Sequence, residues 1–235
     1  MARIRYLRER GVVRVVLLLI IAALIALGVP LQQAAAAEIP RYEPIPPPPL
    51  SADAVFVTDV TSGTELFAQN ADAPLPPASL TKIVSALVVL ERANLDDVIE
   101  ILEGDLVSPE ESQVGLQAGD RLSVRDLLFG MLIPSGNDAT LALARHVGAA
   151  SLDATQSPEQ AVSEFVSLMN LKANELGATA SNFKNPTGID SDGHVMSARD
   201  VAVVTAAALQ DPLFSEIVST TNAVLSSALL PEGYS

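Results

Sequence analysis

The chain has 235 residues, of which 49% are hydrophobic, and this is enough for one domain with a sizeable core. Its 14 basic residues stand against 28 acidic ones, for a net charge of −14, which excludes the basic surface that a nucleic-acid partner needs. The absence of cysteine excludes disulfides, thiolate catalysis and cysteine-ligated zinc.

The N-terminal segment is typical of a secretory signal peptide. Arginines at positions 3, 5, 8 and 10 precede an apolar run from Val15 to Val29, and four alanines follow at 34–37. This run is shorter than the roughly 20 apolar residues that a membrane-spanning helix needs. We therefore expect cleavage after Ala37 and export of the mature protein to the periplasm or cell wall. Contact with a membrane is expected only through residues 1–37, if they stay attached.

The next two segments predict a linker and the start of the folded domain. Residues 38–50 hold six prolines, which favour an extended polyproline conformation that cannot enter a sheet interior. We expect the domain itself to fill residues 51–235. From Ala52 to Gln69 apolar and polar residues alternate on both sides of Thr61-Ser62-Gly63. This pattern is typical of two short antiparallel strands joined by a turn.

Five later segments have apolar residues at the spacing of a helix. The first is apolar on most sides, so we expect it to be buried. Residues 95–120 are rich in turn formers, and residues 185–193 read as a loop. The five predicted helices are Ala78–Ala93, Val124–Leu132, Ala139–Val147, Glu159–Leu176 and Ala198–Leu209.

Ser79 and Lys82 stand three residues apart at the start of the predicted buried helix, so they share one face. A serine hydroxyl needs a base, and a lysine serves when its amine is neutral. Burial and the positive end of a helix dipole both lower a lysine pKa. Ser181 and Lys184 repeat the spacing, but Pro186 follows closely, so that pair is not expected to share a helix face.

The polar loop Ser135-Gly136-Asn137 separates two of the predicted helices. In isolation it is explained by helix capping, because serine and asparagine are preferred caps. Beside a serine–lysine pair, the Ser135 hydroxyl could relay a proton to a leaving amine. The Asn137 amide could bind a substrate carbonyl or hold Lys82. The candidate catalytic residues are Ser79, Lys82, Ser135 and Asn137, and the last two are also candidate substrate-binding residues.

These two motifs resemble the first two of the three that define serine penicillin-recognising enzymes. Within that group the chain is most similar to the D-alanyl-D-alanine carboxypeptidases, from about Ala52 to about Val218. The resemblance implies a β-lactamase/DD-peptidase-like α/β fold, in which an antiparallel sheet packs against helices beside a helical lobe. It also implies that Ser79 is acylated and that Lys82 is the general base. The matching blocks are PLPPASLTKIVSALVVLE, VGLQAGDRLSVRDLLFGMLIPSGNDATLALA and NFKNPTGIDSDGHVMSARDVA.

The resemblance implies that the substrate is a peptidoglycan stem peptide ending in D-Ala-D-Ala, that β-lactams inhibit, and that no cofactor is needed. The third family motif, Lys-Thr-Gly on a strand, is absent, because none of Lys82, Lys172 and Lys184 precedes Thr-Gly. We therefore expect residues 51–235 to be a catalytic domain that is incomplete at its C-terminus. Alone, such a fragment is expected to fold poorly and to be inactive.

Three alternatives stay open: a class A β-lactamase, a non-catalytic binding module and an inactive truncated product. The β-lactamase is disfavoured because neither Glu164 nor Glu175 lies in a Glu-x-x-Leu-Asn loop. A Ser-His-Asp triad is not predicted, because no Gly-x-Ser-x-Gly turn accompanies the two histidines. Asp190 begins like a calcium loop, but Val201 stands at the position that requires glutamate, so no metal is predicted.

Overall fold

The protein is described by a computed structural model that covers residues 49–152 and 157–225. The chain divides into residues 1–50 and residues 51–235, and the second unit holds every element described below. The predicted signal peptide and nearly all of the predicted linker lie outside the described residues, so both stay predictions.

The predicted hairpin is present. Strands β1 (Val55–Thr58) and β2 (Glu65–Gln69) pair antiparallel, with a register shift between Val57 and Thr58 that leaves Leu66 of β2 without a partner in the pairing. Gly63 has a φ of +71°, a left-handed conformation that glycine adopts without strain, and it closes the turn through a 2.8 Å hydrogen bond from its N–H to Asp59. The expected turn sequence therefore closes the hairpin.

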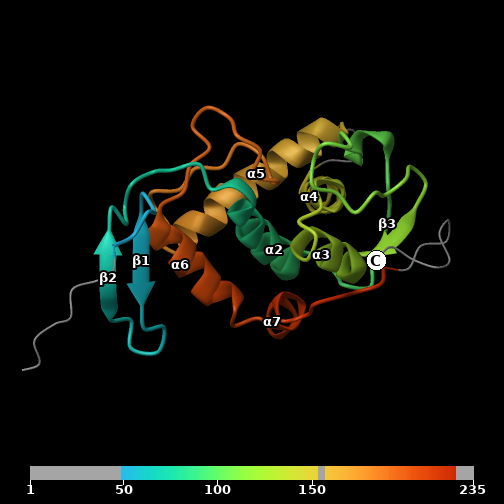
Figure 1. Cartoon of the computed structure of the whole chain (residues 1–235). Helices are drawn as coiled ribbons and strands as arrows, with labels where there is room; N and C mark the ends of the chain where they lie inside the picture. The colour runs from blue at the N-terminus through green and yellow to red at the C-terminus, as the bar shows by residue number, and fades with distance from the viewer. Residues whose placement is uncertain (1–48, 153–156, 226–235) are drawn as a thin grey trace, which may run out of the picture. The chain divides into compact units, whose positions relative to one another are not determined.

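Arg199 joins the hairpin to α6 (Ala198–Ala208), which packs beside β1 (Figure 1). Its guanidinium donates to Asp72 at 2.7 Å and to Glu65 at 2.8 Å. The same group lies 4.4 Å from the ring centroid of Phe56, within the range of a cation–π contact. One side chain thus holds the sheet against a helix, as the predicted fold class requires.

All five predicted helices are found, each within three residues of its expected ends. An additional short helix, α7 (Pro212–Val218), follows the α6 segment, which the sequence predicted as the final helix. Asp211 caps α7 and Pro212 starts it, and its seven residues are too few to show a clear period. The other bounds are α2 (Thr81–Arg92), α3 (Val124–Leu132), α4 (Asn137–Ala150), α5 (Pro158–Glu175) and α7 (Pro212–Val218).

A second two-stranded sheet, β3 (Val98–Glu100) with β4 (Arg121–Ser123), was also missed. Each strand has only three residues, which is too short to show an alternating pattern, so the sequence could not reveal either one. Arg145 of α4 stabilises this region. Its guanidinium donates to the buried carboxylate of Asp105 and, at 2.8 Å, to the carbonyl of Glu100.

Helix α2 lies at the centre of the helical core, as its apolar sequence predicted. It packs against α3, α4, α5 and α6 (Figure 1). Helices α4 and α5 approach closely at Gly148, where a Cβ atom would lie 1.8 Å from the carbonyl oxygen of Ala161. The fully buried apolar residues of α2 are Val84, Ala86, Val88 and Val89.

No single helix in residues 49–152 and 157–225 is long and apolar enough to cross a membrane. Helices α6 and α7 together have the length and apolar composition of a membrane span, but the pair is bent by 113°.

Candidate active site

Ser79 lies in a 3₁₀ turn, η1 (Ala78–Leu80), that leads directly into α2. It therefore precedes the α-helix by two residues instead of lying in its first turn. Ala78 adopts a left-handed conformation with a φ of +48°, which is rare outside glycine. Such strain is found where the surrounding structure fixes a functional group. Ser79 is exposed, so its hydroxyl is open to a substrate.

Lys82 is buried, with 2% of its surface exposed, and its Nζ lies 3.4 Å from Oγ of Ser79. The amine also donates to Oδ1 of Asn137 at 2.7 Å and to the carbonyl oxygen of Thr187 at 2.8 Å. Burial lowers the pKa of Lys82 from 10.5 to about 8, and the negative charge of Glu111 partly opposes that shift. At pH 7 about one amine in ten is then neutral.

Asn137 is the first residue of α4, and its side-chain amide lies between two groups of opposite charge. Its oxygen accepts from Lys82, and its Nδ2 donates to Oε2 of Glu111 at 2.8 Å. The orientation is forced, because an ammonium group only donates and a carboxylate only accepts. Of the two roles expected for this amide, holding Lys82 is the one that the structure contains.

Asp138 fixes the loop that precedes β4 against the start of α4. Its carboxylate accepts hydrogen bonds from the backbone N–H groups of Val114, Gly115 and Leu116, at 2.9 to 3.1 Å. The N–H of Asn137 donates to the carbonyl of Ser112 at 2.8 Å. These bonds hold the segment that carries Glu111 beside the Asn137 amide.

Ser135 lies in a strained backbone conformation beside Ser79 and Lys82. Its φ is +62°, and its Oγ is buried with no hydrogen-bond partner among the described residues. All three side chains line one cavity of about 630 Å³, which we call the serine cavity. An unpartnered buried hydroxyl costs free energy, so this one is available for an incoming polar group. Helices α2, α3, α6 and α7 all contribute to the cavity walls.

The loop at 185–193 completes the surroundings of Lys82, which the sequence did not reveal. Besides the carbonyl of Thr187, the carbonyl of Pro186 accepts from Ser85 of α2 at 2.8 Å. Gly188 has a φ of +92°, and a Cβ there would lie 1.9 Å from the carbonyl oxygen of Ala78. Only glycine fits this approach to the Ser79 turn. The Asn-Pro-Thr-Gly sequence was the available signal, and it indicated only a turn.

His194 anchors the end of this loop to α2, a role for which the sequence carries no local signal. Its Nδ1 accepts from the backbone N–H of Lys184 at 3.0 Å, so the neutral ring carries its proton on Nε2. That nitrogen donates to Oγ1 of Thr81 at 2.9 Å. The ring also makes an edge contact with Phe183. Burial lowers the pKa of His194, with opposing effects of the charges on Asp190 and Lys184.

As the sequence predicted, the second serine–lysine pair does not lie on a helix. Ser181 donates from Oγ to Asp200 at 2.8 Å, and the adjacent Asn182 pairs with Val195 in an isolated β-bridge. The structure therefore brings together Ser79, Lys82, Ser135 and Asn137 but leaves Ser181 and Lys184 outside the site.

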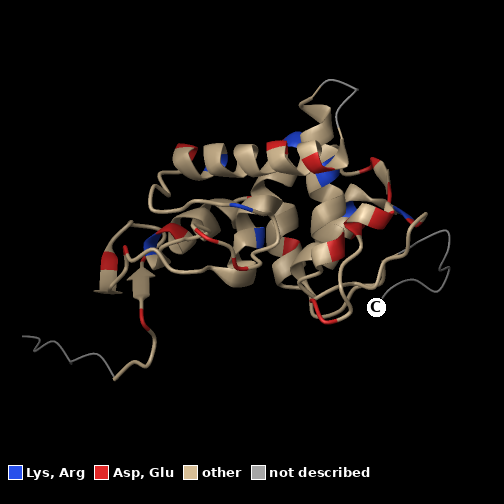
Figure 2. Cartoon of the chain, turned by 90° about the horizontal axis from the view of Figure 1, so that it is seen from above, with Lys and Arg blue, Asp and Glu red and all other residues tan. Residues whose placement is uncertain are grey.

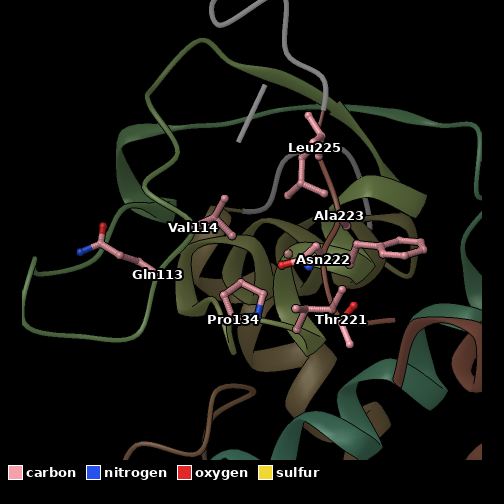
Figure 3. Close-up of a pocket in the computed structure, with 11 residues that line it drawn as sticks. Gln113, Val114, Pro134, Thr221, Asn222, Ala223 and Leu225 are labelled. Carbon is pink, nitrogen blue, oxygen red and sulfur yellow. The ribbon is translucent and has the colours of Figure 1, made fainter. Parts of the chain in front are cut away.

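A smaller apolar pocket of about 260 Å³ lies between α3 and residues 221–225 (Figure 3). Figure 3 shows Val114 on one side of it and Ala223 and Leu225 on the other. None of the four candidate catalytic residues lines it. This pocket is therefore separate from the serine cavity.

Charged residues occur on most elements and do not gather in one patch (Figure 2). Within residues 49–152 and 157–225, no group of three or more histidine, aspartate and glutamate side chains is placed to hold a metal ion.

The D-alanyl-D-alanine carboxypeptidase family matches residues 42–228 of the chain. The chain belongs to this family. Among curated family members, DacF of Bacillus subtilis is 34% identical over 158 residues, which cover 65% of this chain and 38% of DacF. DacB2 of Mycobacterium tuberculosis is 34% identical over 186 residues, which cover 78% of this chain and 59% of DacB2. The chain thus spans less than two thirds of the length of either relative.

Solved structures of similar proteins share the fold, which confirms the predicted fold class. The Streptomyces K15 DD-transpeptidase superposes with a TM-score of 0.71 at 29% identity, over 79% of this chain and 71% of that one. An evolved penicillin-binding protein homologue from Mycobacterium tuberculosis superposes with a TM-score of 0.70 at 30% identity, over 83% and 68% of the two chains.

Proposed function

We propose that this protein is a serine D-alanyl-D-alanine carboxypeptidase that removes the terminal D-alanine from peptidoglycan stem peptides. One observation carries the proposal. A buried lysine amine, with a pKa lowered to about 8, lies 3.4 Å from the exposed hydroxyl of Ser79. Membership of the family and the names of the relatives support the same reaction.

The contacts of Lys82 suit a neutral amine that acts as a base. A neutral amine has two N–H groups and one lone pair. The two short hydrogen bonds, to Asn137 and to Thr187, use both N–H groups, because amide and carbonyl oxygens only accept. The lone pair is then left for the third and longer contact, with Oγ of Ser79. Lys82 is therefore arranged to take the serine proton.

In the proposed acylation step, Oγ of Ser79 attacks the carbonyl carbon of the penultimate D-alanine. The serine proton passes to Nζ of Lys82 as the new ester bond forms. The peptide bond breaks, and the nitrogen of the departing D-alanine takes up a proton. The unpartnered hydroxyl of Ser135, in the same cavity, delivers this proton and takes up the one held by Lys82, so the lysine amine is neutral again when D-alanine leaves.

In the proposed hydrolysis step, water attacks the acyl carbon and Lys82 takes the proton of the water. The ester bond breaks, and Oγ of Ser79 recovers its proton from Lys82. By the same chemistry a β-lactam acylates Ser79 and blocks it. The substrate is a cell-wall peptide, so we also propose that the protein works outside the cytoplasm, in the periplasm or cell wall.

The test is release of D-alanine from a synthetic peptide ending in D-Ala-D-Ala, with the full-length protein, meaning a chain that includes the Lys-Thr-Gly strand absent from these 235 residues. We expect release that a penicillin abolishes and that the Ser79→Ala variant lacks. A matched peptide ending in L-Ala-L-Ala should not be cleaved. Rapid hydrolysis of the penicillin without D-alanine release would instead identify a β-lactamase, and no reaction with either compound would contradict the proposal.

A further inference from the structure

Glu111 is a half-buried carboxylate that belongs to neither catalytic motif and that the proposed reaction does not use. It lies in the loop before β4 and lines a second cavity of about 630 Å³, which we call the glutamate cavity. Thr187 lines the same cavity, while Lys82 lines the serine cavity. Glu111 and Ser79 therefore line different cavities.

A continuous hydrogen-bond path connects Glu111 to the catalytic lysine. Nζ of Lys82 donates to Oδ1 of Asn137 at 2.7 Å, and Nδ2 of the same amide donates to Oε2 of Glu111 at 2.8 Å. Without Glu111 the amide has no fixed acceptor at Nδ2, so its two ends could exchange. An exchanged amide would present N–H groups to Lys82 and could no longer accept from it.

The charge of Glu111 also acts on Lys82. Glu159 and Lys184 line the glutamate cavity from α5 and from the following loop, and Asp138 is occupied by backbone N–H groups. His194 contacts Thr81, the residue next to Lys82 at the start of α2. Among these groups, Glu111 is the one whose charge opposes the effect of burial on the pKa of Lys82. A carboxylate one amide away from an amine favours its protonated form.

We propose that Glu111 is a positioning residue, which orients the Asn137 amide toward Lys82 and whose charge favours the protonated form of that lysine. Glu111 thereby sets the pH range over which Lys82 can act as a base. The catalytic consequence rests on the proposed function, whereas the effect on the lysine itself does not.

The direct test is an NMR titration of the full-length protein labelled with ¹³C at the lysine Cε atoms. The sequence contains three lysines, so Lys82→Arg assigns the relevant signal. Glu111→Gln keeps an acceptor for the amide but removes the charge. We expect the Lys82 midpoint to fall by about 0.5 to 1 pH unit in this variant. Glu110→Gln, which changes the exposed neighbouring residue, is the matched control and should leave the midpoint unchanged.

Acylation by a fluorescent penicillin gives the second measurement. In Glu111→Gln, the rise of the acylation rate with pH should begin at lower pH, so the rate at pH 6.5 should be about three- to tenfold higher. The rate on the plateau at high pH should be unchanged. Glu111→Ala, which also removes the acceptor, should lower the plateau about tenfold, and glutamine should restore it. Thermal unfolding confirms that each variant is folded.

The two proposals fail in different ways. If Glu111→Gln titrates like the unmodified protein, the role of Glu111 is overturned even when Ser79 is acylated normally. If no penicillin reacts with Ser79 but the Lys82 midpoint still falls, the proposed function fails and the effect of Glu111 on Lys82 stands.

Discussion

The carbonyl oxygen of Thr187 accepts a hydrogen bond from Nζ of Lys82 at 2.8 Å, although 105 positions separate the two residues. This bond occupies one N–H group of the amine and helps to aim its lone pair at Ser79. The geometry of the loop at 185–193 is therefore part of the site, and changes in that loop should alter catalysis.

Gly188→Ala should disrupt the site from outside the catalytic residues. The new Cβ would lie 1.9 Å from the carbonyl oxygen of Ala78, in a backbone conformation with a φ of +92°. We expect a loss of about 3 kcal/mol in unfolding free energy and a strong fall in penicillin acylation. Chemical denaturation and fluorescent-penicillin labelling measure the two effects.

Gly193→Ala is the matched control for that loop. Its φ is +74°, but the atom nearest to a new Cβ is 3.5 Å away, at the flexible side chain of Lys184. We expect only the cost of the left-handed backbone, about 1 kcal/mol, with acylation retained. Equal losses in the two variants would show that the approach of Gly188 to Ala78 is unimportant.

The acylation rate should depend on the protonation of Lys82. Because burial lowers the pKa of Lys82 to about 8 and the neutral amine is the base, the rate should rise with pH and level off above about 8. Lys82→Ala should lower the plateau by at least about a thousandfold, and adding it to Ser79→Ala should cause no further loss, because that variant already lacks the nucleophile. Lys184→Ala is the control and should keep the profile. A flat profile between pH 6 and 9 would argue against Lys82 as the base.

The buried His194 should make the protein less stable in acid. Burial lowers the pKa of His194 below its ordinary value of 6.5, so the unfolded chain binds a proton at a higher pH than the folded one. Stability should therefore fall as pH drops below about 6.5. His194→Gln should be less stable at pH 7, because Lys184 and Thr81 lose partners, but its stability should change less between pH 7 and 5. Chemical denaturation at pH 7 and at pH 5 measures the change in unfolding free energy between the two pH values. The same change in His194→Gln as in the unmodified protein would contradict this role of His194.

The sequence predicted the features of the site that are local in the chain. Ser79 and Lys82 are three residues apart, so helical spacing alone places them together. Asn137 and Ser135 were recognised as a polar loop between two apolar helices. Helix lengths and the hairpin followed from periodicity and turn chemistry, since each of these segments is long enough to repeat its pattern.

The missed features depend on contacts between distant segments or on very short elements. Glu111, Thr187 and His194 reach the site from loops without periodicity, and 105 and 113 positions separate Thr187 and His194 from their partners on α2. The strands β3 and β4 have three residues each, and α7 has seven. A single sequence carries no local signal for such pairings.

The most direct test of the account is to find which serine a penicillin acylates, by mass spectrometry of tryptic peptides from the full-length protein. Ser79, Ser135 and Ser181 fall in three different peptides, at 42–82, 126–145 and 173–184. We predict the adduct on the peptide with Ser79, its loss in Ser79→Ala, and its persistence in Ser181→Ala. An adduct on either of the other two peptides, or undiminished labelling of Ser79→Ala, would contradict the assignment of Ser79 as the nucleophile.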